Sequence, residues 1–307
     1  MTDINIENLN QQFAISTPEM RLSIVKGKGG IPLIEVKNQL AEARISLQGA
    51  HILSWLPGDQ NEVIWLSEDA SFSVGKSVRG GIPICWPWFG AHQGKGSFPA
   101  HGFARSVMWE INGTEQLVTG ETQIRFSLNT GQLSDALQDM WPYLTSVEYT
   151  VTLGDSLKLE LKTTNNSSED ITIGEALHTY FNINDIRTTW VEGLDAKEYL
   201  DKPDNFKRKK QNGLINIKEE VDRVYVKTAD DIVINNGHRK IKITKQGSQS
   251  TIVWNPWKAV AEKMGDLGKD GYLQMLCVES ANAAEDVIHI NAGQSHTLNV
   301  TYSVQDV

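Results

Sequence analysis

Apolar and polar side chains alternate along much of the chain, which is the pattern of β-strands with one buried face. The clearest alternation covers residues 147–153 and 157–161, which a Gly-Asp pair separates. Because successive side chains of a strand point to opposite faces, these two runs predict a β-hairpin. Residues 124–128 and 298–304 alternate in the same way and predict two further half-buried strands.

A second hairpin is predicted at the Asn-Asn-Gly-His turn of residues 235–238, because Asn and Gly tolerate the positive φ of tight turns. This turn would join strands at 232–234 and 241–243. Helical spacing is scarce and short, and no Ser/Pro-rich linker or internal repeat divides the chain. We therefore expect an all-β protein with few short helices, folded as one domain over residues 1–307 into a large antiparallel β-sandwich.

Two stretches break the alternation, at residues 75–105 and 254–271, and both are dense in Gly, Pro and Trp. Long irregular loops on a rigid scaffold are where binding groups usually lie. A Trp ring combines a flat apolar face with an N–H edge that suits a pyranose, although core packing is the commoner use of any single Trp. We expect these loops to contribute to a binding site.

The charge balance argues against nucleic acids and membranes as partners. The 307-residue chain has 29 Lys and Arg against 38 Asp and Glu, a formal net charge of −9. Nucleic acids and anionic membranes both require a cationic surface, so we expect neither as a partner. The basic run Lys207–Lys210 precedes a Gln-Asn-Gly turn, which predicts a solvated loop without function. A small anionic ligand needs only one or two local cations and stays open.

The two cysteines, Cys85 and Cys277, lie in apolar stretches, which favours free buried thiols over a disulfide. The first residues show neither the basic nor the apolar segment of a secretory signal. No run of about 18 apolar residues, the length of a membrane span, occurs in the sequence. We expect a cytoplasmic protein, and a monomer because no apolar interface is evident.

Most cofactor motifs are absent or incomplete. Gly75-Lys76-Ser77 resembles the end of a phosphate-binding loop, but Ala70 stands where that motif needs its upstream glycine. No H-E-x-x-H, C-x-x-C, G-x-S-x-G or complete G-x-G-x-x-G occurs, which argues against the simplest zinc, redox, serine-hydrolase and dinucleotide sites. The remaining candidates are acid–base groups that need no cofactor and no metal.

Two histidines and one glutamate stand out from their surroundings. His178 replaces an aliphatic side chain in the strand-like run 175–181, and His101 lies in the first irregular stretch. Glu279 ends the apolar run 276–278, where partial loss of solvent would let a carboxylate act as a base. Each has an ordinary alternative, because a lone histidine is more often structural and a strand-end carboxylate is more often solvated.

Two arginines, Arg79 and Arg105, lie in the same glycine-rich stretch. Glycines let the backbone approach a ligand closely, and two guanidinium groups can form forked hydrogen bonds with a phosphate. Singly, each arginine could equally cover a surface aromatic ring or pair with an acidic side chain. The sequence alone leaves both interpretations open.

Six short motifs together resemble a known family. They are, in chain order, SVRGGIP at 77–83, FPAHGFAR at 98–105, EALHTYF at 175–181, DRVY at 222–225, WNPW at 254–257 and VESAN at 278–282. The set is similar to the hexose-6-phosphate mutarotases, also called glucose-6-phosphate 1-epimerases, of the aldose 1-epimerase family. This resemblance implies the galactose mutarotase-like fold, a large antiparallel β-sandwich, which agrees with the alternation described above.

The resemblance also implies roles for individual residues. His178 matches the family's general acid, and Glu279 matches its general base. Asp222 matches an acid that binds the sugar, and His101 matches a second histidine of the site.

Arg79 and Arg105 match the phosphate-binding arginines that mark the sugar-phosphate branch of the family. Ala100 departs from the pattern, because some members have Gln immediately before the site histidine. A side-chain contact with the ligand is therefore missing here, and the preferred hexose phosphate stays open among glucose, galactose and mannose phosphates.

The implied reaction interconverts α and β anomers by opening and reclosing the hemiacetal. Opening needs an acid for the ring oxygen and a base for the anomeric hydroxyl, but no metal or redox cofactor. In this scheme His178 acts as an imidazolium and Glu279 as a carboxylate. The alternatives are an aldose 1-epimerase that acts on free hexoses, without a convergent arginine pair, and a non-catalytic carbohydrate-binding sandwich.

Overall fold

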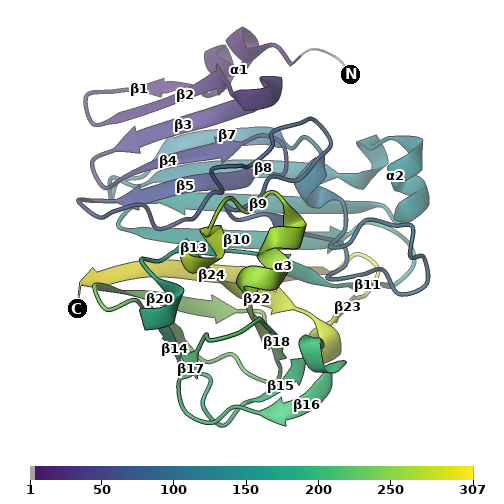
Figure 1. The fold of residues 1–307 in the computed structure, drawn as a ribbon. Helices are drawn as coiled ribbons and strands as arrows, with labels where there is room; N and C mark the ends of the chain where they lie inside the picture. The colour runs from purple at the N-terminus through teal and green to yellow at the C-terminus, as the bar shows by residue number, and fades with distance from the viewer. Residues whose placement is uncertain (1–3, 307) are drawn as a thin grey trace.

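Antiparallel sheets dominate the computed structural model, which describes residues 4–306 (Figure 1). The five-stranded sheet near the N-terminus has the strand order β1-β2-β3-β4-β5. Its strands are β1 (Ile15–Ser16), β2 (Met20–Lys26), β3 (Pro32–Asn38), β4 (Ala41–Ser46) and β5 (His51–Pro57). These strands are purple in Figure 1 and lie in front of the teal strands of the largest sheet.

The nine-stranded sheet contains both hairpins that the alternation predicts. Its order is β17 (Ile215–Asn216), β14 (Trp190–Glu192), β19 (Ile232–Asn235), β20 (Arg239–Gln246), β24 (Ser295–Asp306), β10 (Ser156–Asn165), β9 (Thr145–Leu153), β8 (Thr122–Asn129) and β7 (Glu110–Gln116). The pairs β9–β10 and β19–β20 are antiparallel neighbours. The predicted strands at 124–128 and 298–304 are confirmed as parts of β8 and β24.

The eight-stranded sheet contains residues from four of the six motifs that carry the family resemblance, those at 175–181, 222–225, 254–257 and 278–282. Its order is β16 (Lys207–Lys210), β15 (Glu198–Asp201), β18 (Val221–Tyr225), β21 (Ser250–Asn255), β22 (Met275–Asn282), β12 (Glu175–Leu177) and β6 (Ile84–Cys85), with β13 (Tyr180–Asn182) also paired to β22. A two-stranded sheet joins β11 (Ile171–Ile173) to β23 (Ile288–Ile290). All the pairings between these strands are antiparallel, which confirms the predicted all-β sandwich.

Three α-helices occur within residues 4–306, namely α1 (Ile6–Phe13), α2 (Asp135–Met140) and α3 (Trp257–Met264). The expectation of an irregular stretch at 254–271 is wrong for α3. Pro256 caps the start of this helix, and Gly265 ends it with a φ of 73°. No helix within the described residues is long and apolar enough to cross a membrane.

The basic run Lys207–Lys210 forms the edge strand β16, so the predicted solvated loop is wrong. Acidic partners explain how four charged residues support a strand. Lys209 Nζ lies 2.6 Å from Asp201 Oδ2 on the neighbouring strand, and Arg208 Nη1 lies 3.1 Å from Glu198 Oε2. Charged side chains of this kind also discourage further strands from pairing with an open edge.

The layers meet in one apolar cluster that draws residues from all three large sheets, with Trp55, Trp86 and Trp109 among its largest buried side chains. Polar contacts also cross the layers, since Asn38 Nδ2 donates to the Leu153 carbonyl at 3.1 Å. The expectation of one domain over residues 1–307 stays a prediction. Both cysteines are free and buried, as the sequence predicts.

Candidate active site

The antiparallel register places the candidate residues on one face of the eight-stranded sheet. Asp222 on β18 lies opposite Trp254 on β21, and Trp254 lies opposite Cys277 on β22. Glu279 follows on the same face of β22, opposite Ile252. Because cross-strand partners and alternate residues of a strand share a face, Asp222, Trp254, Cys277 and Glu279 all project from the same side.

His178 follows β12 and reaches Glu279 across the pairing of β12 with β22. Its backbone N–H donates to the Pro83 carbonyl at 3.0 Å, which holds it against the segment that precedes β6. His178 Nε2 lies 3.4 Å from Glu279 Oε1. The His178 side chain is 11% exposed and the Glu279 side chain 1%, so the imidazole is the more accessible member of the pair.

Burial acts on these two groups in opposite directions. It lowers the pKa of His178 well below 6.5, and the neighbouring His101 lowers it further. Burial raises the pKa of Glu279 well above 4.5, and the Asp222 carboxylate raises it further. In the unliganded site, burial therefore favours a neutral imidazole beside a protonated carboxyl. This direction is opposite to the expected imidazolium and carboxylate, because both charged forms lose hydration in the sheet.

Aromatic rings fix the orientation of the His178 imidazole. The Tyr180 ring stacks on it with centroids 4.9 Å apart and planes at 10°, and Trp65 stacks on the far side of Tyr180 at 5.9 Å. Trp254 meets the imidazole edge-on at 6.0 Å. His178 is thus held between packed rings, and only its exposed edge is free to meet a ligand.

Arg79 is connected to this stack of rings. Its Nη1 donates to the Tyr180 hydroxyl at 2.9 Å, and its Nε donates to Asp266 Oδ1 at 3.1 Å. The following Gly81 has a φ of 73°, and a Cβ there would lie 2.5 Å from the Ile52 carbonyl oxygen. Only glycine fits this close approach, which brings the Arg79 segment against β5.

Arg105 approaches the imidazoles from the other irregular segment. Its Nη2 donates to the Ala100 carbonyl at 2.9 Å, within the motif that holds His101. The charges of Arg79 and Arg105 both lower the pKa of His101 and of His178. The charges of both guanidinium groups therefore act on the same two imidazoles.

His101 is held as a neutral hydrogen-bond donor. Its φ is 66°, and its backbone N–H donates to the Gly90 carbonyl at 2.7 Å. The Gly90 N–H donates in turn to His101 Nδ1 at 3.3 Å, which leaves the ring proton on Nε2. Burial, with help from the charge of Arg105, lowers the pKa of His101 to about 3. Its ring centroid lies 5.7 Å from that of His178.

Lys202 is a candidate that the sequence analysis does not identify. It begins the short 3-10 turn Lys202–Asp204, and its Nζ lies 2.6 Å from Asp222 Oδ2. Its charge also acts on Glu279 and His101, where it lowers both pKa values. Nothing in the local sequence marks it, because its place depends on the pairing of β15 with β18.

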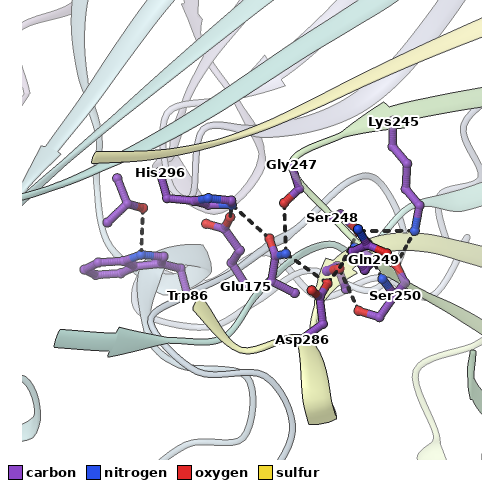
Figure 2. A network of polar contacts seen from close by, with 12 residues as sticks. Trp86, Glu175, Lys245, Gly247, Ser248, Gln249, Ser250, Asp286 and His296 are labelled. Carbon is purple, nitrogen blue, oxygen red and sulfur yellow. Dashed lines mark hydrogen bonds and ion pairs between the residues drawn. The ribbon is translucent and has the colours of Figure 1, made fainter. Parts of the chain in front are cut away.

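A buried polar network anchors the strands of the site to the sheet behind them (Figure 2). Glu175 on β12 lies opposite Asn282 on β22. His296, on β24 of the nine-stranded sheet, places its Nε2 3.4 Å from Glu175 Oε1 and 3.2 Å from Asn282 Oδ1. These contacts tie β12 and β22 to β24, close in the chain to His178 and Glu279.

The sequence profile of the family described as aldose 1-epimerase matches residues 32–303. The chain therefore belongs to the aldose 1-epimerase family and is an isomerase. It is 35% identical over 258 residues to an Escherichia coli K12 protein with the provisional name glucose-6-phosphate 1-epimerase, a match that covers 83% of this chain and 84% of that protein.

Solved structures extend the comparison. A protein from Salmonella typhimurium, provisionally named a mutarotase, has a TM-score of 0.85 at 30% identity, and the match covers 98% of this chain and 99% of that one. A galactose mutarotase-like protein from Clostridium acetobutylicum has a TM-score of 0.74 at 11% identity, over 95% and 100% of the two chains, which shows the fold alone. The predicted galactose mutarotase-like fold is confirmed.

The raised pKa of Glu279 makes the stability of the fold depend on pH. The folded chain keeps this carboxyl protonated above 4.5, where the carboxyl of the unfolded chain ionises. Stability therefore falls as the pH rises from about 4.5, until the folded carboxyl itself ionises. Glu279→Gln lacks this pH-dependent loss and is expected to raise the melting temperature more at about pH 8 than at about pH 4.

Thermal unfolding of the wild type and the variant at both pH values measures this difference. Glu110→Gln, at an exposed position of β7, is the matched control and should change little at either pH. An equal shift for Glu279→Gln at both pH values would contradict the raised pKa of the buried carboxyl.

Proposed function

We propose that the protein interconverts the α and β anomers of a hexose 6-phosphate, with glucose 6-phosphate as the first candidate. The observation that carries the proposal is the 3.4 Å separation of His178 Nε2 and Glu279 Oε1. The action of Arg79 and Arg105 on the same imidazole supports a phosphorylated substrate. The provisional name of the Escherichia coli relative points to the same substrate.

The proposed chemistry uses a proton that the site already holds. A neutral imidazole beside a carboxylic acid has as many protons as an imidazolium beside a carboxylate, so moving one proton from Glu279 to His178 prepares the pair. His178 then donates to the ring oxygen while Glu279 accepts the proton of the anomeric hydroxyl. The bond between C1 and the ring oxygen breaks and an aldehyde forms. Rotation about C1–C2 and reclosure by the reverse steps give either anomer.

A bound phosphate would favour the catalytic charge state. The positive charges of Arg79 and Arg105 lower the pKa of His178 in the unliganded site. A phosphate dianion between the two guanidinium groups would offset those charges and so favour the imidazolium. A free hexose brings no such charge, so in this proposal the phosphate supports proton transfer as well as binding.

The remaining residues of the site suit the hydroxyl groups of a pyranose. His101 offers the proton on Nε2 as a donor, and the Asp222 carboxylate offers acceptors. Trp254, beside His178, presents an aromatic ring against which an apolar sugar face can pack. We also propose that the protein is a monomer and that it lies in the cytoplasm. The location fits the substrate, because a phosphorylated sugar crosses a bilayer only at a high desolvation cost.

Anomer exchange of glucose 6-phosphate, followed by NMR magnetisation transfer, tests the proposal directly. The exchange rate should rise in proportion to protein concentration above the spontaneous rate. His178→Asn and Glu279→Gln should each slow the catalysed rate by about 10²- to 10⁴-fold. The pH dependence of kcat/KM should be bell-shaped, since acid adds a proton to His178 and alkali removes the one on Glu279.

Two results would reject the proposal. Sugar binding without faster exchange would make the protein a non-catalytic carbohydrate-binding sandwich. A flat dependence of kcat/KM from about pH 5 to about pH 9 would reject the acid–base pair, because protonation of its members would then not matter.

Arg105→Ala tests the phosphate site. The variant should raise KM for glucose 6-phosphate by about 10- to 150-fold, the effect of losing a charge-assisted hydrogen bond, and should leave turnover of free glucose nearly unchanged. Arg187→Ala, which removes an exposed guanidinium paired with Asp185, is the matched control. Equal losses for both sugars would favour an aldose 1-epimerase that acts on free hexoses.

Tyr180→Phe separates the two contacts of Tyr180. The variant keeps the ring stacked on His178 but loses the hydroxyl that accepts from Arg79, so KM for the sugar phosphate should rise by about 2- to 12-fold. The limbs of the pH profile should not move, because the imidazole keeps its neighbours. Steady-state kinetics across pH measures both, with Tyr143→Phe outside the site as control. A lower kcat at unchanged KM would contradict this role.

A further inference from the structure

A sulfur atom lies beside the acid–base pair and has no part in the proposed proton transfers. The ligand atoms of His178, Cys277 and Glu279 all lie within 4.8 Å of one another. Cys277 reaches this position because its strand pairs it with Tyr180 on one side and Trp254 on the other. The three residues are buried on the same sheet face as the candidate active site.

The spacing and the chemistry of these atoms suit zinc. Zinc binds thiolate, imidazole and carboxylate ligands at roughly 2.0–2.3 Å, so the ligand atoms of a tetrahedral site lie roughly 3.3–3.6 Å apart. His178 Nε2 and Glu279 Oε1, at 3.4 Å, already have this separation. A change of the Cys277 side-chain rotamer is then the main adjustment required.

We propose that His178, Cys277 and Glu279 form an inhibitory site for a zinc-class divalent cation, with the fourth ligand position left to water. Besides the spacing of the three ligand atoms, one observation points to a ligand at this place. Glu279 Oε2 is a buried polar atom without a hydrogen-bond partner among the described residues. The exposed edge of His178 provides the way in.

Charge balance lowers the desolvation cost of burying such a metal complex inside the sheet. The cation displaces one proton from the Cys277 thiol and one from the Glu279 carboxyl, while the imidazole binds in its neutral form. The two ligand charges then cancel the charge of the cation, so the buried complex is neutral overall. Metal binding should therefore release two protons and tighten as the pH rises.

Some charged groups around the cluster oppose the binding of a cation, and others favour it. Arg79 and Arg105 face it from the two irregular segments and oppose a cation, as does Lys202 from the turn after β15. The Asp222 carboxylate on β18 favours a cation. Burial raises the pKa of the Cys277 thiol, so a metal must replace a tightly held proton. These opposing effects predict binding that competes with protons across neutral pH.

Binding of the cation and its effect on turnover can be measured separately. A cation on these atoms blocks both groups that transfer protons, so the expected inhibition rests on the proposed function. Binding itself depends only on the three side chains. Measuring the two independently keeps a failure of one distinguishable from a failure of the other.

Cobalt(II) reports on the thiolate directly. Added to the full-length protein, it should give a near-ultraviolet absorption from sulfur-to-metal charge transfer, and zinc should displace it. Cys277→Ser should abolish this absorption and weaken zinc binding by more than about tenfold. Cys85→Ser is the matched control, because Cys85 is the only other cysteine and is also buried in this sheet.

Thermal unfolding of both serine variants, with Cys277→Ala as a second substitution, shows whether each still folds. Isothermal titration in buffers of different ionisation enthalpy should count two protons released per zinc ion. Zinc should slow anomer exchange in the wild type and in Cys85→Ser but much less in Cys277→Ser, each compared with its own rate without zinc. Cobalt bound without the sulfur absorption, or an absorption that survives in Cys277→Ser, would overturn the proposal.

Discussion

The desolvation of Glu279 is the constraint on which the site depends. All eight residues of β22 are buried, and this carboxyl lies within that strand with Oε2 unpartnered among the described residues. A carboxylate there would lack the hydration that stabilises its charge, so burial favours the protonated carboxyl. Burial of the neighbouring imidazole favours its neutral form in the same way. The pair can therefore exchange one proton without creating net charge inside the sheet.

Contacts on both faces of the eight-stranded sheet help to hold His178 and Glu279 in place. On the site face, Tyr180 and Trp254 pack around the imidazole. On the opposite face, Glu175 and His296 connect β12 to the nine-stranded sheet (Figure 2). Burial also raises the pKa of Glu175, although the contact with His296 partly offsets this effect. The sheet thus holds these groups among buried neighbours on both of its faces, where packing limits their movement.

The alternation of apolar and polar residues along the chain predicts the fold better than it predicts the candidate active site. Period-2 alternation identifies the β9–β10 hairpin because one face of each strand is buried and the other is not. It misses β16, whose four residues are all charged and whose strand depends on acidic partners elsewhere in the chain. It also misses α3, a helix of eight residues that is too short to show a clear apolar period.

The site depends on contacts between distant segments, and this limits what the sequence can show. His178 and Glu279 stand out only as unusual residues in apolar runs, and their roles come from the family resemblance. Lys202 and Tyr180 have no local signal, because one depends on strand pairing and the other on a ring stack. The sequence also does not predict the charge state of His178 and Glu279, since desolvation is a property of the packed sheets and not of residue types.

The distribution of charge explains how an acidic protein can favour an anionic ligand. The chain as a whole carries a formal charge of −9, yet Arg79, Arg105 and Lys202 all act on His101. Asp266 and Asp222 pair with two of these cations and hold them in place. With Glu279 protonated, the three cations Arg79, Arg105 and Lys202 outnumber the two carboxylates Asp222 and Asp266 by one charge. In the proposed function, a phosphate dianion would be attracted by this excess charge, whereas a neutral sugar would gain nothing from it.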